Sequence, residues 1–212
     1  MPSYKVPSSD LEIQEVIKNS HFITRIYNKD SAEAAKAQIK QLRQQYPDAT
    51  HHCWAYIVGK PQSTTLIGCS DDGEPSGTAG KPMLQVLQHS DVGDILAVCT
   101  RYFGGTKLGT GGLARAYGGG VKLALEQLSL KIKISYLPLS FELDYTQLQD
   151  CQHLIKDYQI QNLTIDYQSE IIIHLEISEK QKTGFVAALT NLTKGQVVYL
   201  DPRNDGLLKY IP

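Results

Sequence analysis

The sequence lacks long apolar runs and any marked excess of one charge. It holds 21 basic and 22 acidic side chains in 212 residues, so its net charge of -1 gives no overall electrostatic reason to bind nucleic acid. Its apolar runs, such as 95–99 and 171–173, fall far short of the roughly 20 residues that a membrane helix needs. Residues 1–10 have neither the basic start nor the apolar stretch of a signal peptide. We therefore expect no membrane span and a cytoplasmic protein.

Cysteine is also scarce, and its spacing excludes the common metal and redox motifs. The chain has Cys53, Cys69, Cys99 and Cys151 but no C-x-x-C, which argues against zinc ribbons and thioredoxin-like chemistry. Buried thiols are the expected role for all four. We predict neither a bound structural metal nor a cofactor.

The remaining composition is that of a globular protein, with 42% hydrophobic and 20% charged residues. In the first part of the chain, periodicity and turn signals predict helices and strands in alternation. The expected helices are 31–45, a helix starting near Pro82, and 113–128, and the expected strands are 51–58, 63–70 and 94–101.

The pattern of predicted elements changes after Lys131. Strand, helix, strand, strand, helix and strand patterns follow at 137–144, 146–158, 159–167, 170–178, 179–193 and 196–200. This order is that of a ferredoxin-like split βαβ domain. We predict two domains, residues 1–132 and 133–212, with 201–212 as an irregular tail.

Three consecutive glycines interrupt the helical pattern at 113–128. Gly118, Gly119 and Gly120 each cost up to about 1 kcal/mol against alanine in a helix interior, so something must offset them. We expect them to lie where the helix and sheet backbones approach closely.

A glycine-rich loop at 102–112 has the composition of an anion site. Its glycines allow backbone N–H groups to surround an anion, and a helix N-terminus follows. The candidate phosphate or nucleic-acid ligands are Arg101, Gly104, Gly105, Lys107, Gly109 and Arg115. The loop matches neither the P-loop nor the Rossmann fingerprint in its context, and tight turns or close packing are the alternative role of these glycines.

An acidic segment at 71–74 is a second candidate site. Its carboxylates could hold Mg²⁺ or position a general base, although the same residue types build ordinary turns. The candidate residues of this acidic loop are Asp71, Asp72, Glu74, Ser76, Thr78 and Lys81. His51 and His52 point to opposite faces of a strand, which favours histidines with polar partners over a ligand cluster.

The two loops together resemble a known family. The run from Ser70 to Pro82, SDDGEPSGTAGKP, and the run from Gly93 to Gly109, which ends in YFGGTKLG, are similar to the bacterial, YigZ-like branch of the IMPACT family. The resemblance covers the chain from about Tyr4 to Leu130, and the segment that follows is similar to the small second domain of those proteins.

This resemblance implies an α+β protein with a ribosomal protein S5 domain 2-like N-terminal domain and a ferredoxin-like C-terminal domain. It also implies a role in translation, because this domain pair is similar to the last two domains of the translocating elongation factor. Eukaryotic IMPACT proteins regulate translation by competing for the activator of an initiation-factor kinase. They use a further N-terminal domain for this, so that mechanism is not carried over.

Three functions follow as hypotheses. The first is a non-catalytic protein of translation or its regulation, which contacts RNA or the ribosome through the basic glycine-rich loop. The second is an enzyme acting on a phosphorylated or nucleotide substrate, with the acidic loop as a metal or proton site. The third is an interaction module whose groove takes a peptide from a protein partner. A basic rim without a deep cavity favours RNA, whereas converging carboxylates in a cavity favour catalysis.

Overall fold

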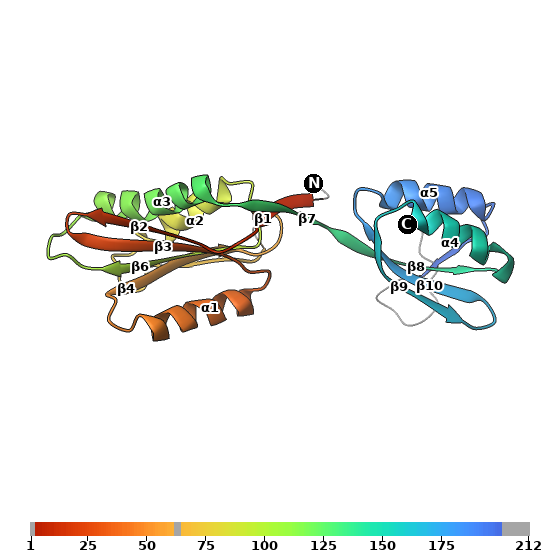
Figure 1. Ribbon diagram of the computed structural model, residues 1–212, viewed down its shortest axis with the longest axis horizontal. Helices are drawn as coiled ribbons and strands as arrows, with labels where there is room; N and C mark the ends of the chain where they lie inside the picture. The colour runs from red at the N-terminus through yellow and green to blue at the C-terminus, as the bar shows by residue number, and fades with distance from the viewer. Residues whose placement is uncertain (1–2, 62–64, 201–212) are drawn as a thin grey trace. The chain divides into compact units, whose positions relative to one another are not determined.

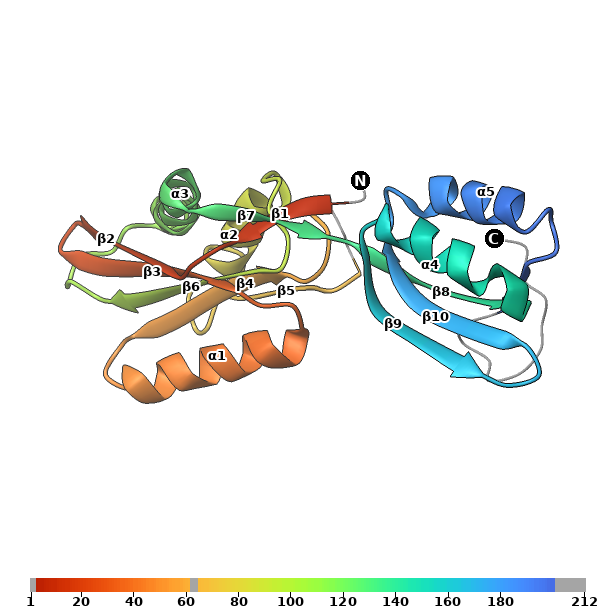
Figure 2. The same ribbon diagram turned by 45° about the vertical axis from the view of Figure 1, so that its right-hand side comes forward.

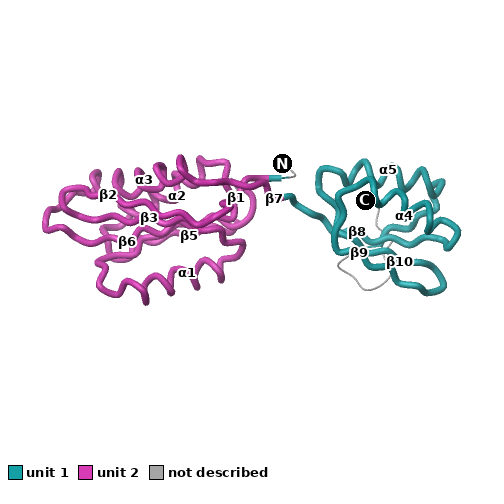
Figure 3. Tube along the Cα trace, viewed as in Figure 1, with its two compact units in different colours: residues 1–3, 134–212 teal, residues 4–133 magenta. Residues whose placement is uncertain are grey.

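The computed structural model describes residues 3–61 and 65–200. The chain divides into two compact units, one of residues 4–133 and one of residues 134–200 together with Ser3 (Figure 3). The expected tail at 201–212 and part of the expected strand 63–70 lie outside the described residues. Of the helices in the described ranges, none combines the length and apolar content that crossing a membrane requires.

The N-terminal domain is built on a five-stranded antiparallel sheet with the order β2-β3-β6-β4-β5. Its strands are β2 (Leu11–Ile17), β3 (Ser20–Asn28), β4 (His51–Ile57), β5 (Ile67–Ser70) and β6 (Ile95–Tyr102). One face is covered by α1 (Ala32–Gln45), and the other by α2 (Gly80–Gln88) and α3 (Thr110–Gln127) (Figure 1). The sheet therefore has a core on each side.

Local sequence explains how these layers form. Ser31 caps α1 by accepting a hydrogen bond from the Ala34 amide at 3.1 Å, and the helix buries Ile39 and Leu42. Cys53, Ala55 and Ile57 of β4 join the core under α2 and α3, whereas Tyr56 of β4 and Val58, the residue after it, join the core under α1. The alternation predicted for 51–58 is confirmed.

The triple glycine of α3 meets three different environments. A Cβ on Gly120 would lie 2.7 Å from Thr24 Oγ1 of β3, so this position requires glycine, as predicted. A Cβ on Gly118 would make ordinary 3.7 Å contacts with Pro82 and Val86 of α2. A Cβ on Gly119 would meet nothing within 4 Å. The expectation of a close approach to the sheet is therefore right for Gly120 and wrong for Gly119.

A two-stranded sheet joins the first and last strands of this domain, β1 (Ser3–Pro7) and β7 (Leu130–Ile134). Asp94, which has a φ of 45°, lies beside it and is 1% exposed. Its carboxylate accepts hydrogen bonds from the Tyr4 hydroxyl at 2.8 Å, the Gly59 amide at 2.7 Å and Lys133 Nζ at 2.6 Å. One buried side chain thus connects three distant segments.

The C-terminal domain has an antiparallel sheet of order β11-β8-β10-β9 with two helices on one face (Figure 2). Its elements are β8 (Tyr136–Leu143), a 3₁₀ turn (Tyr145–Gln147), α4 (Leu148–Lys156), β9 (Ile160–Tyr167), β10 (Ile171–Ser178), α5 (Lys182–Leu192) and β11 (Val198–Leu200). β8, the first of these four strands along the chain, lies in the sheet between β11, the fourth, and β10, the third. The predicted ferredoxin-like fold is confirmed.

The cysteines depart from expectation at one position. Cys53, Cys99 and Cys151 are buried, whereas Cys69 is exposed, and all four are free thiols. The prediction of four buried thiols is wrong for Cys69, which lies on β5, the edge strand of its sheet, where few neighbours cover its side chain.

Candidate functional site

The glycine-rich and acidic loops meet at one cavity of about 460 Å³ in the N-terminal domain, here called the loop cavity. Its lining includes His51, Glu74, Arg101, Phe103, Lys107 and Thr110. These residues come from the start of β4, the acidic loop, the end of β6, the glycine-rich loop and the start of α3. The cavity therefore joins the two candidate sites that the sequence suggests separately.

Glu74 is the buried centre of the cavity wall. Its carboxylate accepts hydrogen bonds from Arg101 Nη1 and, at 2.7 Å, from the Tyr117 hydroxyl. His51 Nε2 lies 3.8 Å from the same oxygen. Burial raises the pKa of Tyr117 above its ordinary value, and the nearby Cys53 and Glu74 act in the same direction. Tyr117 therefore remains a protonated donor to Glu74.

Arg101 is part of this wall and is not an exposed cation. The residue is 4% exposed, and its Nη2 donates to Ser20 Oγ at 3.2 Å. Its guanidinium lies over the rings of Phe22 and Phe103, at 5.1 and 5.6 Å from their centroids. Arg101 Nε is buried and has no hydrogen-bond partner within the described residues. The structure thus gives Arg101 the role of holding Glu74 and Phe103 in place.

The glycine-rich loop is fixed to the sheet at its start. The Gly104 amide donates to Ser20 Oγ at 3.1 Å, and a Cβ on Gly104 would lie 2.0 Å from the Asn19 carbonyl group. No larger residue fits this approach without a shift of the backbone. Gly105 follows in a turn with a φ of 83°.

The other end of the loop leads into α3 without a side-chain cap. Gly109 is the N-cap residue, with a φ of 76° that favours glycine, and no side chain bonds to the first-turn amides. Lys107 and Thr110 are exposed and line the cavity beside this helix start. The positive end of the helix dipole and one lysine therefore face the same space.

Arg115 does not line the loop cavity. It lies on the exposed side of α3 and lines a separate groove between α2 and α3. Of the six predicted phosphate or nucleic-acid ligands, the structure brings Arg101, Lys107 and Gly109 to the cavity. Gly104 and Gly105 belong to the loop that borders it.

The acidic loop is held by its own backbone contacts. Asp71 accepts hydrogen bonds from the amides of Gly77, Ala79 and Gly80, at 2.7 to 2.9 Å. Desolvation raises the pKa of Asp71, but these three hydrogen bonds outweigh it, so the pKa lies below its usual value. Asp71 thus acts as the acceptor that shapes the turn into α2.

Asp72 and the neighbouring polar residues also have structural roles or point to solvent. The Asp72 carboxylate pairs with Arg43 and accepts from the His52 amide at 2.6 Å. Thr78 donates its hydroxyl to the Pro75 carbonyl at 2.6 Å. Ser76 and Lys81 are exposed. The described part of the chain has no group of three or more His, Cys, Asp or Glu side chains that could hold a metal ion.

The two histidines diverge, as expected for neighbours on a strand. His51 Nδ1 lies 2.8 Å from the Asp72 carbonyl oxygen, and its ring lines the loop cavity. His52 Nε2 lies 3.0 Å from the Tyr46 carbonyl oxygen. Burial lowers the pKa of His52 below its usual value. Each ring has a polar partner, and only His51 belongs to the cavity.

Sequence reasoning missed the contribution of Phe103, Tyr117 and Ser20 to this site. Sheet register brings Ser20 and Phe103 close, because their neighbours His21 of β3 and Tyr102 of β6 pair with each other, and Tyr117 reaches the site from α3. No local motif contains this information. The one available signal was the buried stripe of α3, which includes Tyr117.

The fold and the cavity define a two-domain α+β protein, with an S5 domain 2-like domain that carries the site and a ferredoxin-like domain that follows it. The chain belongs to the IMPACT family. The family profile described as the Impact N-terminal domain matches residues 18–125, and the profile described as a domain of unknown function, DUF1949, matches residues 141–196.

Bacterial relatives match over nearly their full length. The chain is 45% identical over 198 residues to an IMPACT family member of Haemophilus influenzae, covering 93% of this chain and 96% of the relative. It is 40% identical over 200 residues to the IMPACT family member YigZ of Escherichia coli, covering 94% and 98%. A crystal structure titled as that of a hypothetical protein matches with a TM-score of 0.74 and 40% identity, covering 94% of this chain and 97% of the other. Family and fold are thereby shown.

Proposed function

We propose that this protein is a non-catalytic RNA-binding protein of translation or its regulation, and that the loop cavity holds a nucleotide of a single RNA strand. One observation carries the proposal: Lys107, the uncapped start of α3 and Phe103 line the same cavity. Together they match the phosphate and the base of one nucleotide. Its membership of the IMPACT family, whose eukaryotic members regulate translation, supports the assignment to translation.

The phosphate would bind where a positive charge and free backbone amides lie together, at the start of α3. The first three residues of α3, Thr110 to Gly112, have backbone N–H groups without partners inside the helix, and the dipole favours an anion there. Lys107 adds one full positive charge at the same end of the cavity. Arg101 is neutralised by Glu74, so we assign it a positioning role.

The base of the bound nucleotide would stack on Phe103. This side chain is 48% exposed although it is large and apolar, and its ring lines the cavity. The buried guanidinium of Arg101 lies 5.6 Å from its centroid. Exposed aromatic rings beside cations are the platforms on which single-stranded bases stack with little sequence preference.

A second candidate function is favoured by one observation. His51 lies 3.8 Å from the buried Glu74 carboxylate and lines the same cavity as Lys107. A histidine oriented by a carboxylate is suited to proton transfer on a phosphorylated substrate. Asp71 and Asp72 accept hydrogen bonds that shape the loop, so this enzyme would rest on His51 and Glu74.

The test is a salt series of binding to a fluorescein-labelled single-stranded RNA, a 12-mer of uridine, using the full chain. Lys107→Ala should lower the slope of log K against log salt by about 0.7 to 1, the contribution of one phosphate. Its control is Lys40→Ala, an exposed lysine of α1 on the opposite face of the sheet. Equal slopes for Lys107→Ala and Lys40→Ala would remove RNA phosphate binding from this site.

The base contact is tested separately with Phe103→Ala. Loss of one stacked base should weaken binding about 5- to 150-fold and leave the salt slope unchanged. Tyr167→Ala, which removes an exposed aromatic of the C-terminal domain, is the control. RNA cleaved during these measurements, with cleavage lost in His51→Gln, would instead favour the enzyme.

A further inference from the structure

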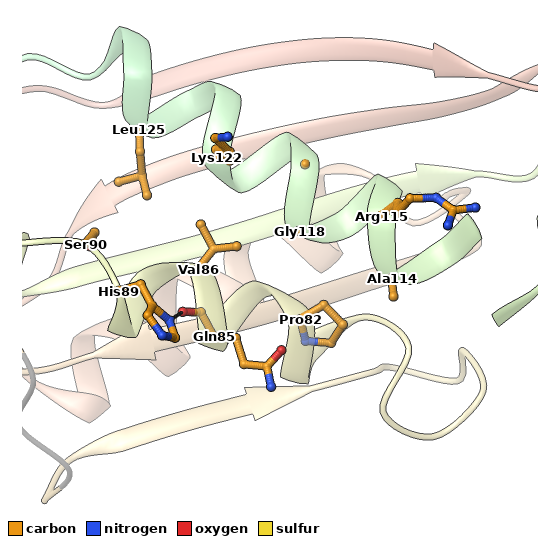
Figure 4. A pocket seen from close by; sticks show the side chains of 11 residues that line it. Pro82, Gln85, Val86, His89, Ser90, Ala114, Arg115, Gly118, Lys122 and Leu125 are labelled. Carbon is orange, nitrogen blue, oxygen red and sulfur yellow. Dashed lines mark hydrogen bonds between the residues drawn. The ribbon is translucent and has the colours of Figure 1, made fainter. Parts of the chain in front are cut away.

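A second concavity, of about 760 Å³, lies between α2 and α3 on the outer side of the N-terminal domain (Figure 4). We call it the α2–α3 groove. Pro82, Val86, Ala114, Gly118, Gly119 and Leu125 contribute its small and aliphatic surface. Phe, Tyr and Trp are absent from its lining. Its surface therefore suits aliphatic side chains better than stacked bases.

Gly119 is the first observation that points to an occupant. Glycine inside a helix costs about 1 kcal/mol against alanine, yet a Cβ here would meet nothing within 4 Å. Gly120, its neighbour, is explained by the contact with Thr24. No contact of the described residues explains Gly119. Packing within this domain does not require glycine at this position of the groove wall. The missing side chain leaves room for another backbone to approach closely.

The charges of the groove are the second observation. Arg115 and Lys122 both line it and are exposed, and neither forms an ion pair with another described residue. They lie seven residues apart, which is about two helical turns or roughly 10.5 Å along α3. The lining contains no Asp or Glu. The groove thus combines an aliphatic surface with two positive charges that lie two helical turns apart on α3.

We propose that the α2–α3 groove docks an acidic amphipathic helix of another protein. Aliphatic residues of that helix, at three- and four-residue spacing, would fill the space over Val86 and Leu125, and its backbone would approach Gly119. Carboxylates two turns apart on its flank would pair with Arg115 and Lys122. This surface is separate from the loop cavity, so RNA and the partner helix do not compete for it.

A second copy of this chain is a poor match for the same groove. None of the described α-helices contains more than one acidic residue. The exposed face of α1, for example, carries Lys36, Lys40 and Arg43. The positive charges of the groove therefore favour an acidic helix from a different protein over a helix of a second copy of this chain.

The test uses an 18-residue fluorescein-labelled peptide of Glu, Ala and Leu, with Leu on one helical stripe and Glu beside it, and the full chain as receptor. We expect this peptide to bind at least tenfold more tightly than a scrambled peptide or one with Lys for Glu, measured by anisotropy. Gly119→Leu should weaken binding at least tenfold by filling the groove. Lys122→Glu should abolish the preference for the acidic over the basic peptide, because it leaves Arg115 balanced by one negative charge.

Gly184 of α5 offers a matched control, because a Cβ there also meets nothing within 4 Å. Gly119→Ala and Gly184→Ala should both raise the melting temperature, but only changes at Gly119 should weaken peptide binding. If Gly119→Leu does not fold, Gly119→Ala and Lys122→Glu still decide the matter.

Three results would overturn the proposal. One is equal affinity for the acidic and scrambled peptides. Another is self-association of the chain that Gly119→Leu abolishes, which would make a second copy the occupant. The third is loss of uridine 12-mer binding in Gly119→Leu, which would assign the groove to RNA.

Discussion

Glu74 and Arg101 form an ion pair inside the N-terminal domain, where their side chains are 4% and 5% exposed. The pair connects the acidic loop to β6, which are separate in sequence. Removing one partner of such a pair leaves the other charge buried without compensation, and this costs more than the pair contributes.

Glu74→Ala should therefore lower the free energy of unfolding by about 3–5 kcal/mol. The reason is that Arg101 and the Tyr117 hydroxyl both lose their acceptor. Urea denaturation measures this change. Glu126→Ala, which removes an exposed glutamate of α3, should stay within about 0.5 kcal/mol of the parent protein. Similar costs for the two variants would contradict a buried role for Glu74.

Asp71 should make folding stability depend on pH in the acid range. Its pKa is below the usual 3.8 in the folded protein, so the folded state binds this proton more weakly than the unfolded state does. The resulting stability is complete above the unfolded pKa and is lost as the pH falls through the lower folded pKa. Unfolding free energies measured from pH 6 to pH 2 should show this loss.

The matched variant for that experiment is Asp71→Asn. It should cost about 1 kcal/mol at pH 7, because the amide is a weaker acceptor for the three backbone N–H groups. It should also reduce the fall in stability below pH 4. Asp91→Asn, at an exposed aspartate, is the control. An acid profile unchanged by Asp71→Asn would show that other carboxylates govern it.

Thiol reactivity should distinguish Cys69 from the other cysteines. Burial raises the pKa of all four thiols, to about 12 for Cys99 and Cys151, but Cys69 is exposed and the other three are buried. A disulfide reagent should therefore modify one thiol in the native protein and four in urea. Cys69→Ser should abolish the rapid reaction. Rapid modification of two or more thiols in the native state would show that a core opens readily.

The two domains should fold separately. Each core cluster of the described residues lies within one domain, the first and third before residue 133 and the second after it. Brief digestion with subtilisin should cut between about Ser129 and Pro138 and leave two fragments that each unfold cooperatively. A protease-resistant whole chain, or a fragment that is unfolded once separated, would contradict this.

The elements that the sequence predicted well are those with strong local periodicity. The helix expected at 31–45 is α1, which buries the predicted stripe of Ile39 and Leu42, although its N-cap is Ser31 and not Asp30 of the expected capping box. The strand expected at 170–178 is β10, whose apolar residues alternate toward one core. In such segments the local pattern and the tertiary packing agree.

Two of the segments that sequence reasoning left unassigned, β1 and β7, depend on distant partners, whereas β2 and β3 were missed although they pair locally across the turn at Lys18 and Asn19. β1 and β7 pair with each other across almost the whole domain, and nothing in either segment specifies that partner. The same holds for the site. Glu74 and Arg101 were both candidate residues, but their pairing follows from the pairing of β5 with β4 and of β4 with β6, and not from their spacing.

The meeting of β1 and β7 beside Asp94 places the entrance and the exit of the N-terminal domain next to each other. A domain whose ends adjoin can be circularly permuted, because a short connection replaces the old termini and new ones open in a surface loop. For the same reason, it can be inserted into a host protein as a closed cassette that carries its loops unchanged. Evolution and protein engineering can thus move this domain between chains without rebuilding its sheet.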